Sequence, residues 1–127
     1  MIPALAKRLP SILICLCLVA GRASAQSQEQ AQERLVDTVN RAEQMTSRAG
    51  EKFQAGDTAG GCVDLRAATT DSQTSLDLVR QLAGQIGQDT TLHDDTRDQM
   101  LQDLQNMSAR LTSQKQTLDA RISARCN

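Results

Sequence analysis

Residues 57–62 read Asp-Thr-Ala-Gly-Gly-Cys and residues 121–126 read Arg-Ile-Ser-Ala-Arg-Cys, so a cysteine lies near each end of the segment that decides the fold. Between these cysteines the sequence carries two helical repeats separated by a turn. Two such helices pack antiparallel when their connection is short. The start of the first then lies beside the end of the second, which is where Cys62 and Cys126 occur. We therefore predict a helical hairpin whose open end is tied by a Cys62–Cys126 disulfide.

Three segments show the three- and four-residue spacing of apolar side chains that is typical of amphipathic helices. The first begins at Glu33, the second runs from about Thr58 to Ile86, and the third follows a turn at residues 88–91. Gly56 can end the first helix in a left-handed conformation, and Asp57 can cap the second. The first stripe is Leu35, Val39, Ala42, Ala49 and Phe53. The second is Cys62, Leu65, Ala68 or Thr69, Ser72, Leu76, Val79, Ala83 and Ile86. The third is Met100, Leu101, Leu104, Met107, Leu111, Leu118 and Ile122.

The fold class that follows is all-α, an up-down-up three-helix bundle over residues 33–127 in which each helix buries its stripe against the other two. Two of the stripes are interrupted. Residues 69–75 of the second helix are small and polar, which predicts either a close approach of backbones or a weak helix. Gln114 and Lys115 stand where the third stripe is due another apolar residue.

The length of the connection between the second and third helices tests this layout. A symmetric hairpin tied at Cys62 and Cys126 would turn at residue 94, whereas the glycine and capping signals lie at residues 87–91. Since each helical residue rises about 1.5 Å, the mismatch has to be absorbed somewhere. We predict a loop spread over roughly residues 87–94, or a bend in one helix.

The first 25 residues have the pattern of a cleavable signal helix. Lys7 and Arg8 precede an apolar run over residues 9–20, and Ala23 and Ala25 form an A-x-A cleavage site. The apolar run is shorter than the roughly 20 residues that span a membrane, so no stable membrane anchor is expected after cleavage. The predicted mature chain begins at Gln26, with a polar lead-in over residues 26–32 that frays. We expect a periplasmic or secreted protein.

Charge and composition exclude several classes of function. The predicted mature chain of 102 residues has 11 basic and 15 acidic residues, a net charge of −4. Nucleic acid is not an expected partner, because binding it requires a basic stripe. Cys62 and Cys126 are the two cysteines that remain, and an even number in an exported chain favours a disulfide over free thiols or an intermolecular bridge. Large apolar residues number only about 20, so the bridge is expected to matter for stability.

No catalytic or cofactor motif is present. The sequence has one histidine, no Gly-x-Ser-x-Gly elbow and no glycine-rich phosphate loop. We therefore expect neither an enzyme nor a cofactor. A group that could hold a divalent cation is the acidic turn, which consists of Asp89, His93, Asp94, Asp95 and Asp98. Its spacing matches no calcium loop, and a solvated turn followed by helix-capping acids explains the same residues.

The leading functional hypothesis is an exported, non-enzymatic bundle that acts by contact with a partner protein in the cell envelope. Val36, Leu78 and Leu92 lie off the main stripes and are candidates for that contact. The alternative is a small periplasmic module that binds a metal or ligand at the acidic turn.

Overall fold

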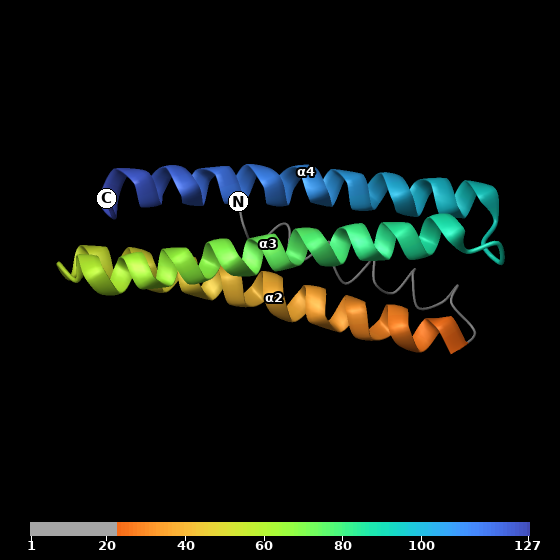
Figure 1. Ribbon diagram of the computed structural model, residues 1–127, viewed down its shortest axis with the longest axis horizontal. Helices are drawn as coiled ribbons and strands as arrows, with labels where there is room; N and C mark the ends of the chain where they lie inside the picture. Colours follow the sequence, from red (N-terminus) through yellow and green to blue (C-terminus); the bar gives the residue numbers. More distant parts are fainter. Residues whose placement is uncertain (1–22) are drawn as a thin grey trace.

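The protein consists of three long helices in the computed structural model, which describes residues 23–127 and their side chains from residue 28 onward. The helices are α2 (Ala23–Gln54), α3 (Thr58–Gln88) and α4 (Asp94–Arg125). They run up, down and up, and the described residues contain no strand (Figure 1). The predicted all-α fold class is confirmed, whereas the signal helix predicted for residues 1–25 falls almost wholly outside the described residues.

α3 is the central helix of the bundle (Figure 1). Both α2 and α4 pack along it, but no Cα atom of α2 comes within 8 Å of a Cα atom of α4. α2 and α4 are therefore farther from each other than either is from α3, although side chains of both helices belong to the same apolar cluster. The reason lies in α3, whose apolar arc is wide enough for α2 and α4 to occupy its two sides separately.

The junction between α2 and α3 is built as the sequence predicts. Gly56 has a φ of +83°, the left-handed conformation that ends a helix and that glycine adopts without a steric penalty. The backbone N–H of Asp57 donates to the carbonyl of Lys52 at 2.8 Å. The Asp57 carboxylate then accepts from the N–H of Gly60 at 2.9 Å and caps the first turn of α3.

α2 begins ten residues earlier than predicted. Residues 26–32, expected to fray as a polar lead-in, belong to the helix. Gln28, Ala31 and Gln32 are buried within it. Glutamine and alanine are good helix formers, so the polar residues before Leu35 can continue the helix toward the N-terminus.

The core is divided into two separate apolar clusters. The larger one lies toward the α3–α4 turn and contains Leu35, Val39, Leu76, Leu78, Val79, Leu82, Ile86, Leu92, Met100, Leu104, Met107 and Leu111. The smaller one lies toward the disulfide and contains Ala49, Leu65, Ala68 and Leu118, with Met45, Phe53 and Ile122 packed against it. Most of the predicted stripe residues are in one of these clusters.

Two residues proposed for an external contact belong to the core instead. Leu78 and Leu92 are 4% and 6% exposed, and both pack in the larger cluster. Leu78 is buried because the buried arc of α3 is wider than the predicted stripe. Leu92 is buried because it packs from the α3–α4 connection into the larger cluster. Val36 is half-buried.

The α3–α4 connection spans residues 89–93, within the range predicted for a spread loop. The Asp89 carboxylate accepts from the backbone N–H of Thr91 at 3.0 Å. A guanidinium nitrogen of Arg97 donates to the Leu92 carbonyl at 3.3 Å. These bonds hold a loop whose length brings the far ends of both helices into register.

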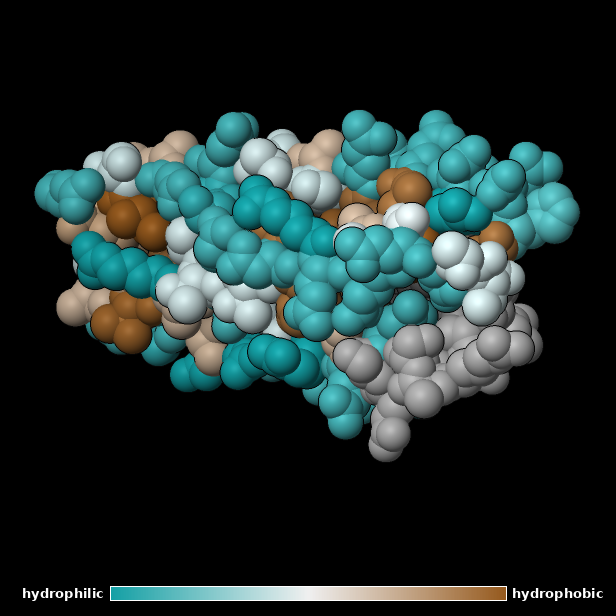
Figure 2. All heavy atoms as spheres, turned by 45° about the vertical axis from the view of Figure 1, so that its right-hand side comes forward, coloured by the Kyte–Doolittle hydropathy of each residue, from teal (hydrophilic) through white to brown (hydrophobic). Residues whose placement is uncertain are grey.

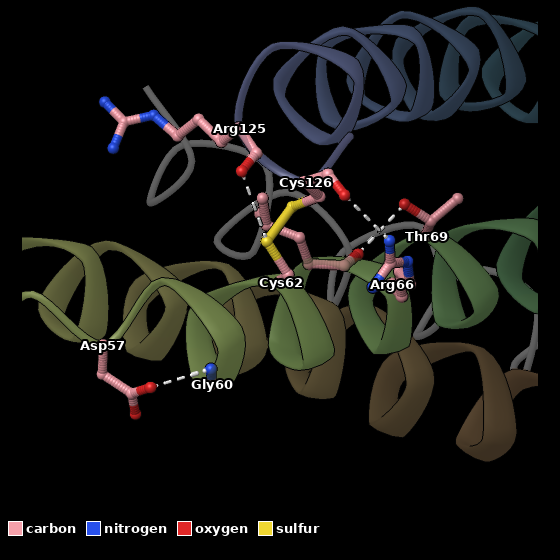
Figure 3. The surroundings of a disulfide bond; sticks show 8 residues. Asp57, Gly60, Cys62, Arg66, Thr69, Arg125 and Cys126 are labelled. Atoms are coloured by element: carbon pink, nitrogen blue, oxygen red, sulfur yellow. Dashed lines mark hydrogen bonds between the residues drawn. A yellow bond between two sulfur atoms is a disulfide. The ribbon is translucent and has the colours of Figure 1, made fainter.

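The predicted disulfide is present. Cys62 and Cys126 are bonded, with their Cα atoms 5.7 Å apart (Figure 3). Arg66 on α3 donates to the Cys126 carbonyl at 3.5 Å, so the last residues of the chain are held against α3 by a polar contact as well.

Among residues 23–127, no helix combines the length and the apolar character needed to cross a lipid bilayer.

Candidate functional site

The side chains of the acidic turn that sequence analysis singled out are not gathered into one group in the structure. Asp89 is occupied within its own loop, where it also accepts from the Thr91 hydroxyl. Asp94 forms an ion pair with Arg97 at 2.6 Å. His93 precedes the first residue of α4, and its side chain makes no capping hydrogen bond.

Asp95 and Asp98 are exposed on the first two turns of α4. Within the described part of the chain, no three histidine, cysteine, aspartate or glutamate side chains come together in a way that could hold a metal ion. The turn supplies negative charge at the N-terminal end of α4, where it opposes the positive end of the helix dipole.

A different feature has the properties of a binding site: a pocket of about 220 Å³ between α2 and α4, with α3 as its floor. We call it the central groove. Its lining consists of Val39, Ala42, Glu43 and Thr46 from α2; Ser72 and Ser75 from α3; and Leu111, Ser113, Gln114, Thr117, Leu118 and Arg121 from α4.

The position of the central groove follows from the interrupted stripes. Ser72 and Ser75 are buried, but their side chains are too small to fill the space between α2 and α4. Gln114 lines the groove at the point where the α4 stripe lacks an apolar residue. Val39 and Leu111 belong to the larger cluster and Leu118 to the smaller one, so the groove separates the two halves of the core.

Glu43 is the acidic residue of the central groove. Its side chain is half-buried, and Oε1 is shielded from solvent without a hydrogen-bond partner among the described residues. Burial raises the pKa of this carboxyl above its ordinary value, because a desolvated carboxylate is disfavoured relative to the neutral acid. An unpartnered buried acceptor of this kind typically costs about 1–3 kcal/mol of stability.

The hydroxyl groups of the groove are mostly acceptors. Thr46, Ser75 and Thr117 each donate their proton to the carbonyl four residues earlier in their own helix, at 2.8, 2.9 and 3.1 Å. A hydroxyl that has donated its only proton has lone pairs left for another group. The groove therefore combines apolar walls with several hydrogen-bond acceptors.

Arg121 is the basic residue of the central groove. It is half-buried, and no ion pair joins it to Glu43 or to another carboxylate in the described residues. Its long side chain can pack its methylene groups on the groove wall while the guanidinium stays in water.

A second buried carboxylate has a structural explanation. Asp64 on α3 has a 7% exposed side chain, and its Oδ2 lies 2.8 Å from Nζ of Lys52 and 3.9 Å from Nε of Arg48 on α2. This cluster joins α2 to α3 beside the smaller apolar cluster. Because two basic residues of α2 already lie beside Asp64, this carboxylate fixes the packing of the two helices and is not a candidate for binding a ligand.

Outside the groove, exposed large apolar residues are scarce among the described residues. Figure 2 shows a face that is mostly hydrophilic, on which hydrophobic residues appear as separate small patches. Val63, at 64% exposed, is the large apolar residue most open to solvent among those described. Isolated apolar residues of this kind are normal on soluble proteins, so they do not by themselves mark an interface.

Comparison with known proteins gives no match: no family model, no curated protein and no solved structure resembles this chain.

The central groove was not identified from the sequence, although its signals are present. The small polar run at residues 69–75 and the break at Gln114 were each recognised, but separately. Aligning the antiparallel helices from the predicted disulfide would have placed both interruptions at the same level. Glu43 had no distinguishing pattern, because a charged residue beside an apolar stripe is common on amphipathic helices.

Proposed function

We propose that this chain is an exported, non-enzymatic helical-bundle protein that acts by binding another protein, and that the central groove is its contact surface. One observation carries the proposal. α2 and α4 both flank α3, no Cα atom of one lies within 8 Å of a Cα atom of the other, and the space between them is lined by a mixture of apolar and hydrogen-bonding side chains.

A helix is the partner segment that fits such a surface best. α2 and α4 run in the same direction on either side of α3 (Figure 1), and the groove is lined by residues within 39–46 of α2 and 111–121 of α4. An additional helix in that position would complete a four-helix arrangement. Amphipathic helices bind grooves of this kind through apolar side chains spaced three and four residues apart.

Export is supported by the leader-like residues 1–25 and by the disulfide, because such bonds persist in oxidising compartments. The compartment that we propose is the periplasm or the extracellular medium. If the leader is removed as proposed, the intact mass of the protein recovered from that fraction corresponds to a chain that begins at Gln26.

The test of the proposed surface is site-specific photo-crosslinking in the cells that make the protein. Thr117 and Thr112 form a matched pair, since both are exposed on α4 and both donate to the carbonyl four residues earlier. Only Thr117 lines the central groove. A photoreactive residue at position 117 should capture a discrete partner, and one at position 112 should not. Equal capture at both positions, or capture at neither, would refute the proposal.

No observation favours the alternative of a metal-binding module at the acidic turn, because Asp89 and Asp94 form separate local contacts and the described residues contain no group of side chains that could hold a metal ion.

A further inference from the structure

We infer that the occupant of the central groove is a helical segment of the partner protein that inserts a lysine or arginine side chain against Glu43. The inference rests on the proposed function and names the chemistry by which the partner is recognised. It follows from the size of the pocket, the character of its walls and the kind of hydrogen-bonding groups that it presents.

The size of the pocket favours a side chain over a free ligand. Pockets that enclose drug-sized molecules are typically about 300–1,000 Å³, whereas this one has a volume of about 220 Å³. A space of this size accepts one long side chain from a helix that lies in the groove. The remainder of such a helix would rest on the outer parts of α2 and α4.

The walls match the stem of a basic side chain. Val39, Leu111 and Leu118 supply apolar surface on both sides of the pocket. Lysine and arginine carry three or four methylene groups that pack on such surface while the charged end reaches a polar group. A short polar side chain would leave these walls uncovered, and an aliphatic one would leave the carboxylate without a partner.

Three polar groups of the pocket are acceptors that still lack a donor, although Gln114 and Arg121 also line it. Glu43 presents an oxygen that has no partner among the described residues, and the Ser75 and Thr117 hydroxyls have already donated their protons. A lysine ammonium has three donors and no acceptor, and an arginine guanidinium has five donors. Hydrogen bonds from such cations to a carboxylate are about twice as strong as neutral ones.

Glu43 is free to receive a cation from outside the chain. Its neighbours three and four positions away on α2 are Val39, Asn40, Thr46 and Ser47, none of which is charged. α3 contributes Ser72 and Ser75 to the same pocket, and α4 contributes Arg121 as its charged residue. Arg121 does not pair with Glu43 and opposes an incoming cation, so its removal should strengthen binding.

The probe that tests this inference is n-pentylammonium, which reproduces the stem and charge of a lysine side chain. Neutral n-pentanol and anionic pentanoate are its matched controls. Each is titrated into the isotope-labelled, disulfide-bonded protein, and the amide shifts of residues that line the groove are followed by NMR. We expect n-pentylammonium to bind in the groove at least about fivefold more tightly than n-pentanol, and pentanoate to bind most weakly.

Two groove variants and one control variant make the test specific. Glu43→Gln should remove the preference for n-pentylammonium, and Arg121→Gln should increase it, while Thr112→Val should leave it unchanged. The inference is overturned if n-pentanol binds as tightly as the cation, if the preference survives in Glu43→Gln, or if the groove amides do not respond. Those results would overturn the inference about the basic side chain without contradicting a crosslink to a partner at position 117. A missing crosslink would refute the proposed function, and with it the partner helix, whatever the probe shows.

Discussion

Cys62 at the start of α3 and Cys126 just after α4 have Cα atoms 5.7 Å apart although 64 positions separate them in the sequence. This covalent link closes the end of the hairpin that lies opposite the α3–α4 turn. The smaller apolar cluster lies beside it and contains only four buried residues, so the bond supports the part of the bundle that has the least core. The larger cluster at the other end is held by many more apolar contacts.

Reduction of this bond should lower the melting temperature sharply. The bond removes conformational entropy from the unfolded chain. In the loop-entropy treatment, a loop of this length raises the free energy of unfolding by about 4 kcal/mol. For a domain of this size, that corresponds to a fall of about 15 °C or more. Thermal melts with and without reductant measure the effect. The Cys62→Ser variant should have the melting temperature of the reduced wild-type protein, and adding reductant should not change it. An unchanged melt in excess reductant would show that helix packing alone maintains the bundle.

Lys52→Met should destabilise the bundle by about 1–3 kcal/mol, because it leaves Asp64 buried with only the more distant Arg48 as a counter-charge. The loss is smaller than for a fully buried pair, since the Lys52 side chain is 32% exposed. Denaturant unfolding gives the value. Arg80→Met is the matched control: its partner Asp77 is 63% exposed, so the change should be within about 0.5 kcal/mol. Equal effects of the two substitutions would contradict a structural role for Asp64.

Two glycines should respond in opposite directions to replacement by alanine. A Cβ atom at Gly61 would lie 2.8 Å from the Phe53 ring, which would have to move in a packed cluster at a cost of about 1–3 kcal/mol. At Gly50 a Cβ would meet nothing within 4 Å, and alanine in a helix is more favourable than glycine by about 0.5–1 kcal/mol. Denaturant melts of Gly61→Ala and Gly50→Ala should therefore shift to opposite sides of the wild-type curve. If both substitutions increase the free energy of unfolding, the Phe53 ring is free to move away from a Cβ atom at position 61.

Glu43→Gln should stabilise the protein more at pH 7 than at pH 4. Burial raises the pKa of Glu43, so between the ordinary glutamate pKa and the raised one the folded state keeps a proton that the unfolded state has lost. The stabilising contribution of that proton is complete below the ordinary pKa and is lost as the pH rises through the raised one. Glutamine is neutral throughout and escapes this loss.

Urea unfolding of both proteins at the two pH values measures the difference directly. Arg121 is the other charged residue that lines the pocket, and α3 contributes only serines there, so no second carboxylate competes for the effect. The quantity compared is the difference in free energy of unfolding between the variant and the wild type. If this difference is the same at both pH values, or larger at pH 4, then Glu43 is not desolvated.

The helical spacing was sufficient to predict the three helices, most of the core and the disulfide. Ser72, Leu76 and Val79 are buried as their four- and three-residue spacing requires. Periodicity reports which face of a helix is apolar, and the position of two cysteines reports which helix ends meet. Both are local or pairwise signals that can be read from a single sequence.

The features that could not be predicted from the sequence depend on how the three helices pack against one another. Leu78 lies outside the predicted stripe but is buried, because α3 has a neighbouring helix on two sides and buries a wider arc than one stripe. The central groove depends on the separation of α2 from α4, and no single helix encodes that distance. Glu43 becomes distinctive only when the neighbouring helices remove its solvent.

The most direct test of the central claim is to fill the groove from its floor. Ser72 is 2% exposed and lines the pocket, so Ser72→Leu adds apolar volume to an existing space and should raise the stability of the bundle. The decisive measurement is the yield of partner captured by a photoreactive residue at position 117 in this variant. If the groove is the contact surface, the yield falls at least about tenfold although the protein is folded and more stable. Undiminished capture in a well-folded Ser72→Leu protein would contradict it.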